Sequence, residues 1–403
     1  MAEKLESRYA RVFLKNGRDR PVRGGNPWIF SQAIERTEPD RIEAGTPVEV
    51  ISADQTLIGL GYLNLSTTIA IRMLWWRGSK SAPTPSISEL AARRLSNALD
   101  LRRSFVGDDT DSYRVVNGDG DGLSGVVADR YGDVIVVQLL TAGADRMRET
   151  IAAELGRLAN PRAILERSSG AVRRQEGLED SVATIAGEPV ASTVATEGGI
   201  KVKVDFEHGQ KTGYFLDQRE NRARVRSIAK GARVLDAYCY GGGFSLAAIA
   251  GGAARVTAID TSERAIGWAR ENLALNGHRP DAAELIHADA ARYMAETPER
   301  FDLIVLDPPP LARSRADAER AGRLYVELNS LAMQALAPRG RLMTFSCSAH
   351  FGGEDFIRAA RFAQGRASRN LRILAHLGPG SDHPVLLGHA EGEYLTGLLL
   401  GEL

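Results

Sequence analysis

Cysteine is scarce in this sequence, which has 403 residues and only two cysteines. Two cysteines cannot build a disulfide framework, so we expect a protein of a reducing compartment, the cytoplasm. No apolar run is long enough for a membrane-spanning helix, and the charged start MAEKLESRYA lacks the apolar core of a secretory signal. Net charge is absent too, with 51 basic and 51 acidic residues. This balance gives no support to a general nucleic-acid-binding coat, although a local basic patch is compatible with it.

The length predicts two or three domains, and we place the first over residues 1–77. Short runs of β-branched and aromatic residues, turn signals between them and strict alternation in TIAIRML predict a small β barrel. The opening of this region is locally basic and lies close to Trp28 and Phe30. Its basic residues are Lys4, Arg8, Arg11, Lys15, Arg18, Arg20 and Arg23. A solvated face around one anchoring tryptophan is the alternative to a binding surface.

A linker composition, GSKSAPTPS over residues 78–86, separates this region from a second domain over residues 85–195. The helical pattern SELAARRLSNALDLRRSF comes first. Strand patterns follow at YRVVNG, GLSGVVADRY, DVIVVQLL and AILERS, with a second helix near ADRMRETIAAELGRL. We therefore predict a central α+β domain. The loop NGDGDG lacks the ligand spacing and terminal Glu of a calcium loop, so a tight turn and no metal site are expected.

The third region, residues 196–403, alternates strand and helix patterns. Strands are predicted at ARVLDAY, RVTAID, AELIHAD, DLIVLD and RLMTFS, with helices between them. Such alternation indicates crossover units and a parallel sheet with helices on both faces. The fold class is therefore multidomain α/β, with a doubly wound, Rossmann-like C-terminal domain.

Acidic residues close successive predicted strands of this third domain. The first strand runs into VLDAYCYGGGF, and the acids at the strand ends are Asp236, Asp260, Asp289 and Asp307. Ligands of open α/β sheets bind at the carboxyl ends of the strands, and an acid nineteen residues after Gly241 suits ribose hydroxyls. Glycines let the backbone approach a ligand closely. A single Asp is as often a strand-end or capping residue, but four in register favour a nucleoside-bearing cofactor.

The loop after the first strand does not have the GxGxxG spacing of a dinucleotide site. It is rich in tyrosine and suits a ligand without phosphate. The series of acids, the glycine loop and Asp-Pro-Pro resembles the class I S-adenosylmethionine methyltransferases. The residues predicted to line the cofactor in the loop are Tyr238, Tyr240, Gly241 and Gly243.

Cys347 stands between two serines at the end of the fifth predicted strand, which faces the strand end of Asp307. A ring carbon such as cytosine C5 is a poor nucleophile, but a thiolate that adds to C6 makes C5 enamine-like and able to attack a methyl sulfonium. A helix after Gly353 or a nearby cation would lower the thiol pKa. Asp307 is placed to bond the N3/N4 edge of the base. Inert packing is the alternative for Cys347 and is the prediction for Cys239.

Several longer motifs resemble one family, the bacterial 23S rRNA 5-methylcytosine methyltransferases of the RlmI type, over nearly the whole chain. They are NPWIF (26–30), YRVVNGDGDGLSGVVADRYGD (113–133), AILERSS (163–169), VRRQEGLE (172–179), KTGYFLDQRENR (211–222) and SDHPVLLGHAEGEYLTGLLL (381–400).

The resemblance implies an N-terminal PUA RNA-binding domain, S-adenosylmethionine as cofactor, 23S rRNA as substrate and Cys347 as nucleophile. It also implies cofactor contacts by Phe215 and Asp217. RNA contacts are predicted for Arg23, Trp28, Arg219 and Arg222, with a structural salt bridge as the alternative for the last two.

Two residues depart from the family pattern: Pro310 stands where Lys usually follows Asp-Pro-Pro, and YGGGF replaces YTGGF. Two other functions therefore stay open. One is a base N-methyltransferase that does not need the thiol, and the other is a non-catalytic RNA-binding assembly factor with the cofactor fold. The N-terminal domain either docks against the catalytic domain or reaches across a homodimer, and the sequence does not identify the proton-abstracting base.

Overall fold

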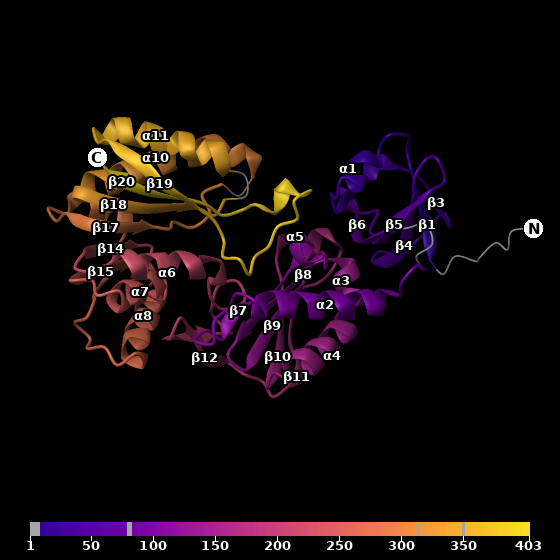
Figure 1. The fold of residues 1–403 in the computed structure, drawn as a ribbon, viewed down its shortest axis with the longest axis horizontal. Helices are drawn as coiled ribbons and strands as arrows, with labels where there is room; N and C mark the ends of the chain where they lie inside the picture. The colour runs from indigo at the N-terminus through magenta and orange to yellow at the C-terminus, as the bar shows by residue number, and fades with distance from the viewer. Residues whose placement is uncertain (1–8, 79–82, 313, 349–350) are drawn as a thin grey trace, which may run out of the picture. The chain divides into compact units, whose positions relative to one another are not determined.

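The computed structural model describes residues 9–78, 83–312, 314–348 and 351–403 (Figure 1). Lys4 and Arg8 of the basic opening, and positions 79–82 of the predicted linker, lie outside the described residues. The chain forms two compact units. Unit 1 contains Met1–Thr193, Asp205–Tyr214 and Asp382–Gly392, and unit 2 contains Val194–Val204, Phe215–Ser381 and Glu393–Leu403.

Unit 1 begins with a six-stranded sheet in the order β2-β6-β5-β4-β1-β3. The edge strands β2 and β3 are joined by the three-residue 3₁₀ helix η1, so the two edges of the sheet must curl toward each other. This matches the predicted barrel. The elements are β1 (Ala10–Leu14), α1 (Arg20–Arg23), β2 (Trp28–Phe30), η1 (Ser31–Ala33), β3 (Ile34–Glu38), β4 (Thr46–Ile51), β5 (Leu57–Leu63) and β6 (Ile69–Trp76).

Unit 1 also contains a five-stranded sheet in the order β11-β10-β9-β8-β7. The capping box of Ser86 and Glu89 starts its first helix, α2. Leu60 and Leu74 of the first sheet share a buried core with Leu95 of α2 and Val116 of β7. The elements are α2 (Ile87–Arg103), β7 (Ser112–Asn117), η2 (Gly118–Asp121), β8 (Val126–Tyr131), β9 (Val134–Leu139), α3 (Ala142–Arg146), α4 (Arg148–Ala159), β10 (Ala163–Ser168), α5 (Ala171–Gln175) and β11 (Ser181–Gly187).

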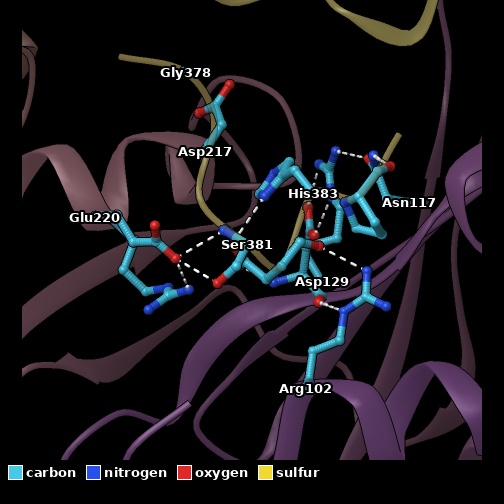
Figure 2. Close-up of polar contacts among 12 residues, drawn as sticks. Arg102, Asn117, Asp129, Asp217, Glu220, Gly378, Ser381 and His383 are labelled. Carbon is cyan, nitrogen blue, oxygen red and sulfur yellow. Dashed lines mark hydrogen bonds and ion pairs between the residues drawn. The ribbon is translucent and has the colours of Figure 1, made fainter. Parts of the chain in front are cut away.

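The NGDGDG loop is the η2 turn between β7 and β8, as the sequence predicted. Its Asp121 carboxylate is held by the fully buried Arg102 through two contacts of 2.6 and 2.8 Å. The loop also binds the returning C-terminal segment of unit 1, because Asn117 Nδ2 donates to the Pro384 carbonyl at 2.9 Å (Figure 2). The acidic loop therefore has a structural role.

Unit 2 contains a seven-stranded sheet in the order β16-β15-β14-β17-β18-β20-β19. Strands β14 to β18 are parallel, as predicted, and β20 runs antiparallel to both β18 and β19. Helices α10 and α11 lie together over one face (Figure 1). The sheet elements and their helices are β14 (Arg233–Ala237), α7 (Gly243–Ala250), β15 (Arg255–Asp260), α8 (Glu263–Leu275), β16 (Glu284–His287), α9 (Ala290–Glu296), β17 (Phe301–Leu306), η4 (Arg315–Asp317), α10 (Ala318–Ala335), β18 (Leu336–Ser346), α11 (Gly353–Ala367), β19 (Leu371–Leu377) and β20 (Thr396–Glu402).

Two short segments precede the first strand of this sheet. The hairpin of β12 (Ser192–Glu197) and β13 (Ile200–Asp205) is bonded to α8, because Lys203 N–H donates to Asn272 Oδ1 at 2.7 Å. The second segment is η3 (Leu216–Gln218), followed directly by α6 (Arg219–Ile228). The 3₁₀ helix η5 (Ala390–Gly392) precedes β20. No helix among the described residues has the length and apolar character to cross a membrane.

Candidate active site

The carboxyl ends of the parallel strands in unit 2 lie level with one another. Ala237 at the end of β14 pairs with Ile259 of β15 and with Leu306 of β17, and Asp260 pairs with His287 of β16. The acids at these strand ends therefore meet at one edge of the sheet. A ligand site is expected at this edge in an open α/β sheet.

The loop between β14 and α7 has an unusual backbone. Tyr238 and Tyr240 have left-handed φ angles of 68° and 49°, and Gly242 follows with 77°. Left-handed conformations are costly for residues other than glycine and concentrate at functional sites. Cys239 between them is fixed because its N–H donates to the Ile259 carbonyl at 2.9 Å. The loop is thus held in a sharp, strained turn over the sheet edge.

Asp260 is oriented by two backbone donors. Its Oδ2 accepts the N–H of Tyr240 and its Oδ1 accepts the N–H of Ser262, both at 2.9 Å. A carboxylate has about four lone-pair sites, so two remain for hydroxyl donors such as those of a ribose. Asp289 caps α9, where its Oδ1 accepts the Arg292 N–H at 2.7 Å. Burial raises the pKa of Tyr238 to about 12, and the Asp289 and Asp260 charges add to the effect.

Asp236 is fully buried and faces inward. Its Oδ2 accepts both the N–H and the hydroxyl of Ser245 in α7, at 2.9 and 2.6 Å. Burial raises the pKa of Asp236 to about 6, although the bonds from Ser245 lower it. The residue joins β14 to α7, and its predicted contact with the cofactor stays a prediction.

Phe215 lies directly before η3, and Asp217 lies within it. Phe215 makes an edge-to-face contact with Tyr240, and Tyr240 makes a second one with Trp268 of α8, with ring centroids 5.2 and 5.4 Å apart. Asp217 is buried and its Oδ2 accepts the hydroxyl of Tyr394 at 2.8 Å. The aromatic row gives one wall of the strand-end site an apolar surface.

Cys347 and the Asp-Pro loop are neighbours, as predicted. The half-buried Cys347 Sγ lies 3.5 Å from the Pro308 carbonyl, in the loop that follows β17. Cys239 differs, since it is 5% exposed and burial raises the pKa of its thiol well above the usual value. A protonated, buried thiol fits the predicted packing role of Cys239.

The two serines beside Cys347 are buried and make hydrogen bonds to neighbouring segments. Ser348 Oγ accepts the N–H groups of Leu311 and Ala312 at 3.0 and 3.2 Å, and lies 3.1 Å from the Tyr325 hydroxyl. Ser346 Oγ lies 2.9 Å from the Tyr325 hydroxyl and 2.6 Å from the Phe351 carbonyl.

The proton order in this hydroxyl chain (Ser348, Tyr325 and Ser346) follows from the number of donors. The Phe351 carbonyl can only accept, so it takes the single Ser346 hydroxyl proton, and the Tyr325 hydroxyl must donate to Ser346. Because the Tyr325 proton is used in this way, the contact between Ser348 and Tyr325 must use the Ser348 proton. The chain thereby ties the loop after Asp307 to the loop that carries Cys347.

Sequence reasoning missed Gln218 and Tyr325. Gln218 Nε2 donates to Asp307 Oδ2 at 3.0 Å, and Gln218 Oε1 accepts from Asn221 Nδ2 at 2.6 Å. The three-residue spacing of Gln218 and Asn221 at a helix start was a signal for one shared face. The only sequence signal for Tyr325 was its hydroxyl group on the largely apolar, buried face of α10.

The four predicted RNA-binding residues lie in different settings. Arg222 is buried in a two-point ion pair with Glu197, both contacts at 2.6 Å, which favours the structural alternative. Arg219 lies near Glu220 at 3.3 Å, and Glu220 also binds Ser381 (Figure 2). Arg23 forms an exposed pair with Asp19.

Trp28, the fourth, connects parts of unit 1. Its Nε1 donates to Asp119 Oδ2 at 3.2 Å, and its ring meets the His389 ring edge-on at 4.4 Å between centroids. These contacts give Trp28 a role as an anchor, and its RNA contact stays a prediction.

The residues at the strand ends suit S-adenosylmethionine. The backbone-oriented Asp260 offers acceptors to a ribose, Asp289 lies one strand further, and the aromatic wall suits an adenosyl group. The fold and this site define an S-adenosylmethionine-dependent methyltransferase. Residues 120–366 match the family described in those words, and residues 12–76 match the PUA-like domain family.

Curated relatives narrow the class. Ribosomal RNA large subunit methyltransferase I of Aeromonas hydrophila is 37% identical over 397 residues, which cover 97% of this chain and 99% of the relative. The enzyme of the same name from Klebsiella pneumoniae (strain 342) is 36% identical, again over 97% of this chain. The chain therefore belongs to the ribosomal RNA large subunit methyltransferase I family.

Solved structures share the fold over 97% of the chain. A proposed S-adenosylmethionine-dependent methyltransferase from Streptococcus mutans has a TM-score of 0.80 and 21% identity, and covers 97% of this chain and 99% of that one. A second, a proposed methyltransferase in complex with SAH, has a TM-score of 0.82 and the same identity and coverage.

Proposed function

We propose that the protein methylates C5 of a cytosine in large-subunit ribosomal RNA, with Cys347 as the nucleophile. Membership in the family supports the coarser part, an S-adenosylmethionine-dependent methyltransferase whose relatives are named for large-subunit ribosomal RNA. The observation that carries the finer part is the place of Cys347, half-buried and 3.5 Å from the Pro308 carbonyl of the Asp-Pro loop.

The Cys347 thiolate forms an S–C6 bond, and the electron pair of the C5–C6 double bond shifts to the C4–N3/N4 side of the ring. When bound, S-adenosylmethionine supplies an electrophilic methyl group. C5 bonds this methyl group as the methyl–sulfonium bond breaks and its electron pair stays on the sulfur of the cofactor. C5 then loses its proton to a base that the proposal leaves unnamed, the C5–C6 double bond forms again, and the S–C6 electrons return to sulfur as the thiolate leaves. Asp307 accepts a hydrogen bond from the base edge and orients the ring.

The serine-anchored loops suit this chemistry, since a nucleophile and a base-binding group must keep a fixed separation. Positioning of this kind contributes a large part of the rate of two-reactant reactions. The target base must leave its stack to reach the strand ends. We propose that the cofactor is held by Phe215, Asp217, Asp236, Tyr238, Tyr240, Gly241, Gly243, Asp260 and Asp289, with Asp307 beside its methyl group.

We further propose three functional segments: residues 1–77 as the PUA-like RNA-binding domain, residues 85–195 as the central domain and residues 196–403 as the methyltransferase domain. RNA would be held by basic side chains such as Arg23 and Arg219, so binding should weaken as salt increases. The proposal includes assembly as a homodimer and action on an assembling large subunit.

The test is transfer of labelled methyl groups to unmodified large-subunit ribosomal RNA by the wild type and Cys347→Ala, followed by nucleoside analysis. The expected result is 5-methylcytosine with the wild type and none with the variant. Cys239→Ala is the matched control and should stay active. Label on an exocyclic nitrogen, or full activity of Cys347→Ala, would refute the thiol mechanism and favour a base N-methyltransferase. Binding of the cofactor without transfer would favour a non-catalytic factor.

A further inference from the structure

Asp307 is held by a chain of side-chain amides that the proposed mechanism does not use. This amide relay consists of the Gly378 carbonyl, Asn221, Gln218 and Asp307. Asn221 Nδ2 donates to the Gly378 carbonyl at 2.9 Å and to Gln218 Oε1 at 2.6 Å, and Gln218 Nε2 donates to Asp307 Oδ2 at 3.0 Å. Gly378 lies in the segment drawn beside Asp217 in Figure 2.

The direction of the relay is fixed by its backbone end. A carbonyl can only accept, so the Asn221 atom that faces Gly378 must be its nitrogen. The same nitrogen faces Gln218, which therefore presents oxygen to Asn221 and its own nitrogen to Asp307. Reversing the Gln218 amide would set two NH2 groups against each other at the Asn221 end and an amide oxygen against the Asp307 carboxylate at the other end.

Burial makes this arrangement effective. Gln218 is 2% exposed and Asn221 is 4% exposed, so water does not replace a lost partner easily. Both come from the start of α6, where positions three apart share a face. The relay thus presents one N–H donor to Asp307 and requires Oδ2 of that residue to remain an acceptor.

We propose that Gln218 and Asn221 are positioning residues which hold Asp307 as a hydrogen-bond acceptor for the 4-amino group of the target base. This inference rests on the proposed function and extends it to base selection. Cytosine offers an N–H donor at position 4, whereas uracil offers an oxygen there. Asp307, which the Gln218 N–H group holds as an acceptor, therefore favours cytosine over uracil. The geometry assigns this selection to the amide relay.

Two substitutions of Gln218 separate positioning from packing. Gln218→Met keeps the shape and removes both polar atoms. Gln218→Glu keeps Asn221 as a donor but sets a carboxylate against Asp307. At acidic pH the introduced carboxyl takes up a proton and can donate to Asp307 again. The groups facing position 218 in the relay are Asp307, which is acidic, and Asn221, which does not titrate.

Initial rates of 5-methylcytosine formation would be measured from pH 5.5 to 8.5 as a ratio to the wild type at each pH, with the full chain. A charge-assisted hydrogen bond is worth roughly a tenfold to hundredfold change. We expect losses of roughly that size for both variants at pH 8, and recovery toward acidic pH for Gln218→Glu alone. The matched control, Gln364→Glu, changes an amide whose Oε1 accepts the Leu371 N–H on another part of unit 2, and should match the wild type.

Base selection would be measured on the RNA with the mapped target cytosine and on the same RNA with uridine there. Gln218→Met should reduce the preference for cytosine by roughly tenfold or more. Cofactor binding by calorimetry shows that each variant is folded. Equal pH profiles for the two Gln218 variants, or an unchanged preference with unchanged rate, would overturn the inference. Absence of 5-methylcytosine with the wild type would overturn the proposed function itself, so the two failures are distinguishable.

Discussion

Ser348→Ala is the sharpest test of how the two active-site loops are joined. The substitution removes the oxygen that accepts the N–H groups of Leu311 and Ala312 and that contacts Tyr325. Ser348 is 1% exposed and Ala312 is 3% exposed, so at least one of the two donors is left without water. An unsatisfied buried donor costs about 1–3 kcal/mol.

Leu311 is half-buried, and water can partly replace the lost partner there. Loss of the oxygen that accepts these two N–H groups, one of them buried, should therefore lower the free energy of unfolding by about 2–4 kcal/mol. For a unit of this size, 1 kcal/mol corresponds to about 2–4 °C in the melting temperature, so we expect a decrease of about 5–15 °C. A displaced Asp-Pro loop should also lower kcat/KM by roughly tenfold to hundredfold.

Thermal unfolding and methyl transfer would be measured for Ser348→Ala beside Ser330→Ala. Ser330 is a serine of similar burial whose hydroxyl donates to the Ala363 carbonyl and so joins α10 to α11. The control should lose about 1 kcal/mol or less, because only one acceptor is affected, and keep its activity. If Ser348→Ala loses no more stability than Ser330→Ala and keeps its kcat/KM, the hydroxyl chain does not hold the two loops together.

Three further predictions follow from the site and from unit 1. Asp260→Ala should weaken binding of S-adenosylhomocysteine by roughly 100-fold in calorimetry, since two charge-assisted bonds to the ribose are lost, and unchanged affinity would exclude the ribose role. The folded pKa of Asp236, about 6, lies above the unfolded value of 3.8, so its contribution to stability is full below pH 4 and is lost as pH rises through 6. Denaturation curves of wild type minus Asp236→Asn should show this loss, about 2–3 kcal/mol, between pH 4 and 7, and a flat difference would contradict it. Trp28→Phe should cost about 1 kcal/mol through the lost bond to Asp119, whereas weaker RNA binding at unchanged stability would favour a direct RNA contact.

The acids at the strand ends were predictable because their positions in the sequence coincide with the ends of the predicted strands. The alternation of strands and helices indicated a parallel sheet, and the acids stood at the strand ends in the sequence itself. The fold class, the family and the cofactor predicted from these features are confirmed by the comparisons and the structure. The antiparallel end of the sheet was not predicted, because β19 and β20 are joined by a long segment that passes through unit 1.

Gln218 shows why the rest of the site was hidden. Its partner Asp307 lies 89 residues further along the chain, and nothing in the local sequence marks one glutamine as facing it. For Arg222 the sequence left both an RNA contact and a structural salt bridge open, and only the fold brings Glu197, 25 residues earlier, into a pair with it, which favours the salt bridge. Pairs of this kind depend on the tertiary fold and carry no local pattern.

Cys347 shows what a short polar motif means once it is folded. Ser346 and Ser348 are fully buried while Cys347 between them is half-buried, the reverse of what their polarity suggests. An alternation that continues past the end of β18 at Ser346 explains this, because Ser346 and Ser348 both contact the Tyr325 hydroxyl of α10 whereas Cys347 contacts the Pro308 carbonyl. The hydroxyl chain satisfies the buried serines and thereby turns the thiol toward Pro308. Changes to the serines should therefore alter where the sulfur lies, whereas changes to Cys347 should alter the chemistry itself.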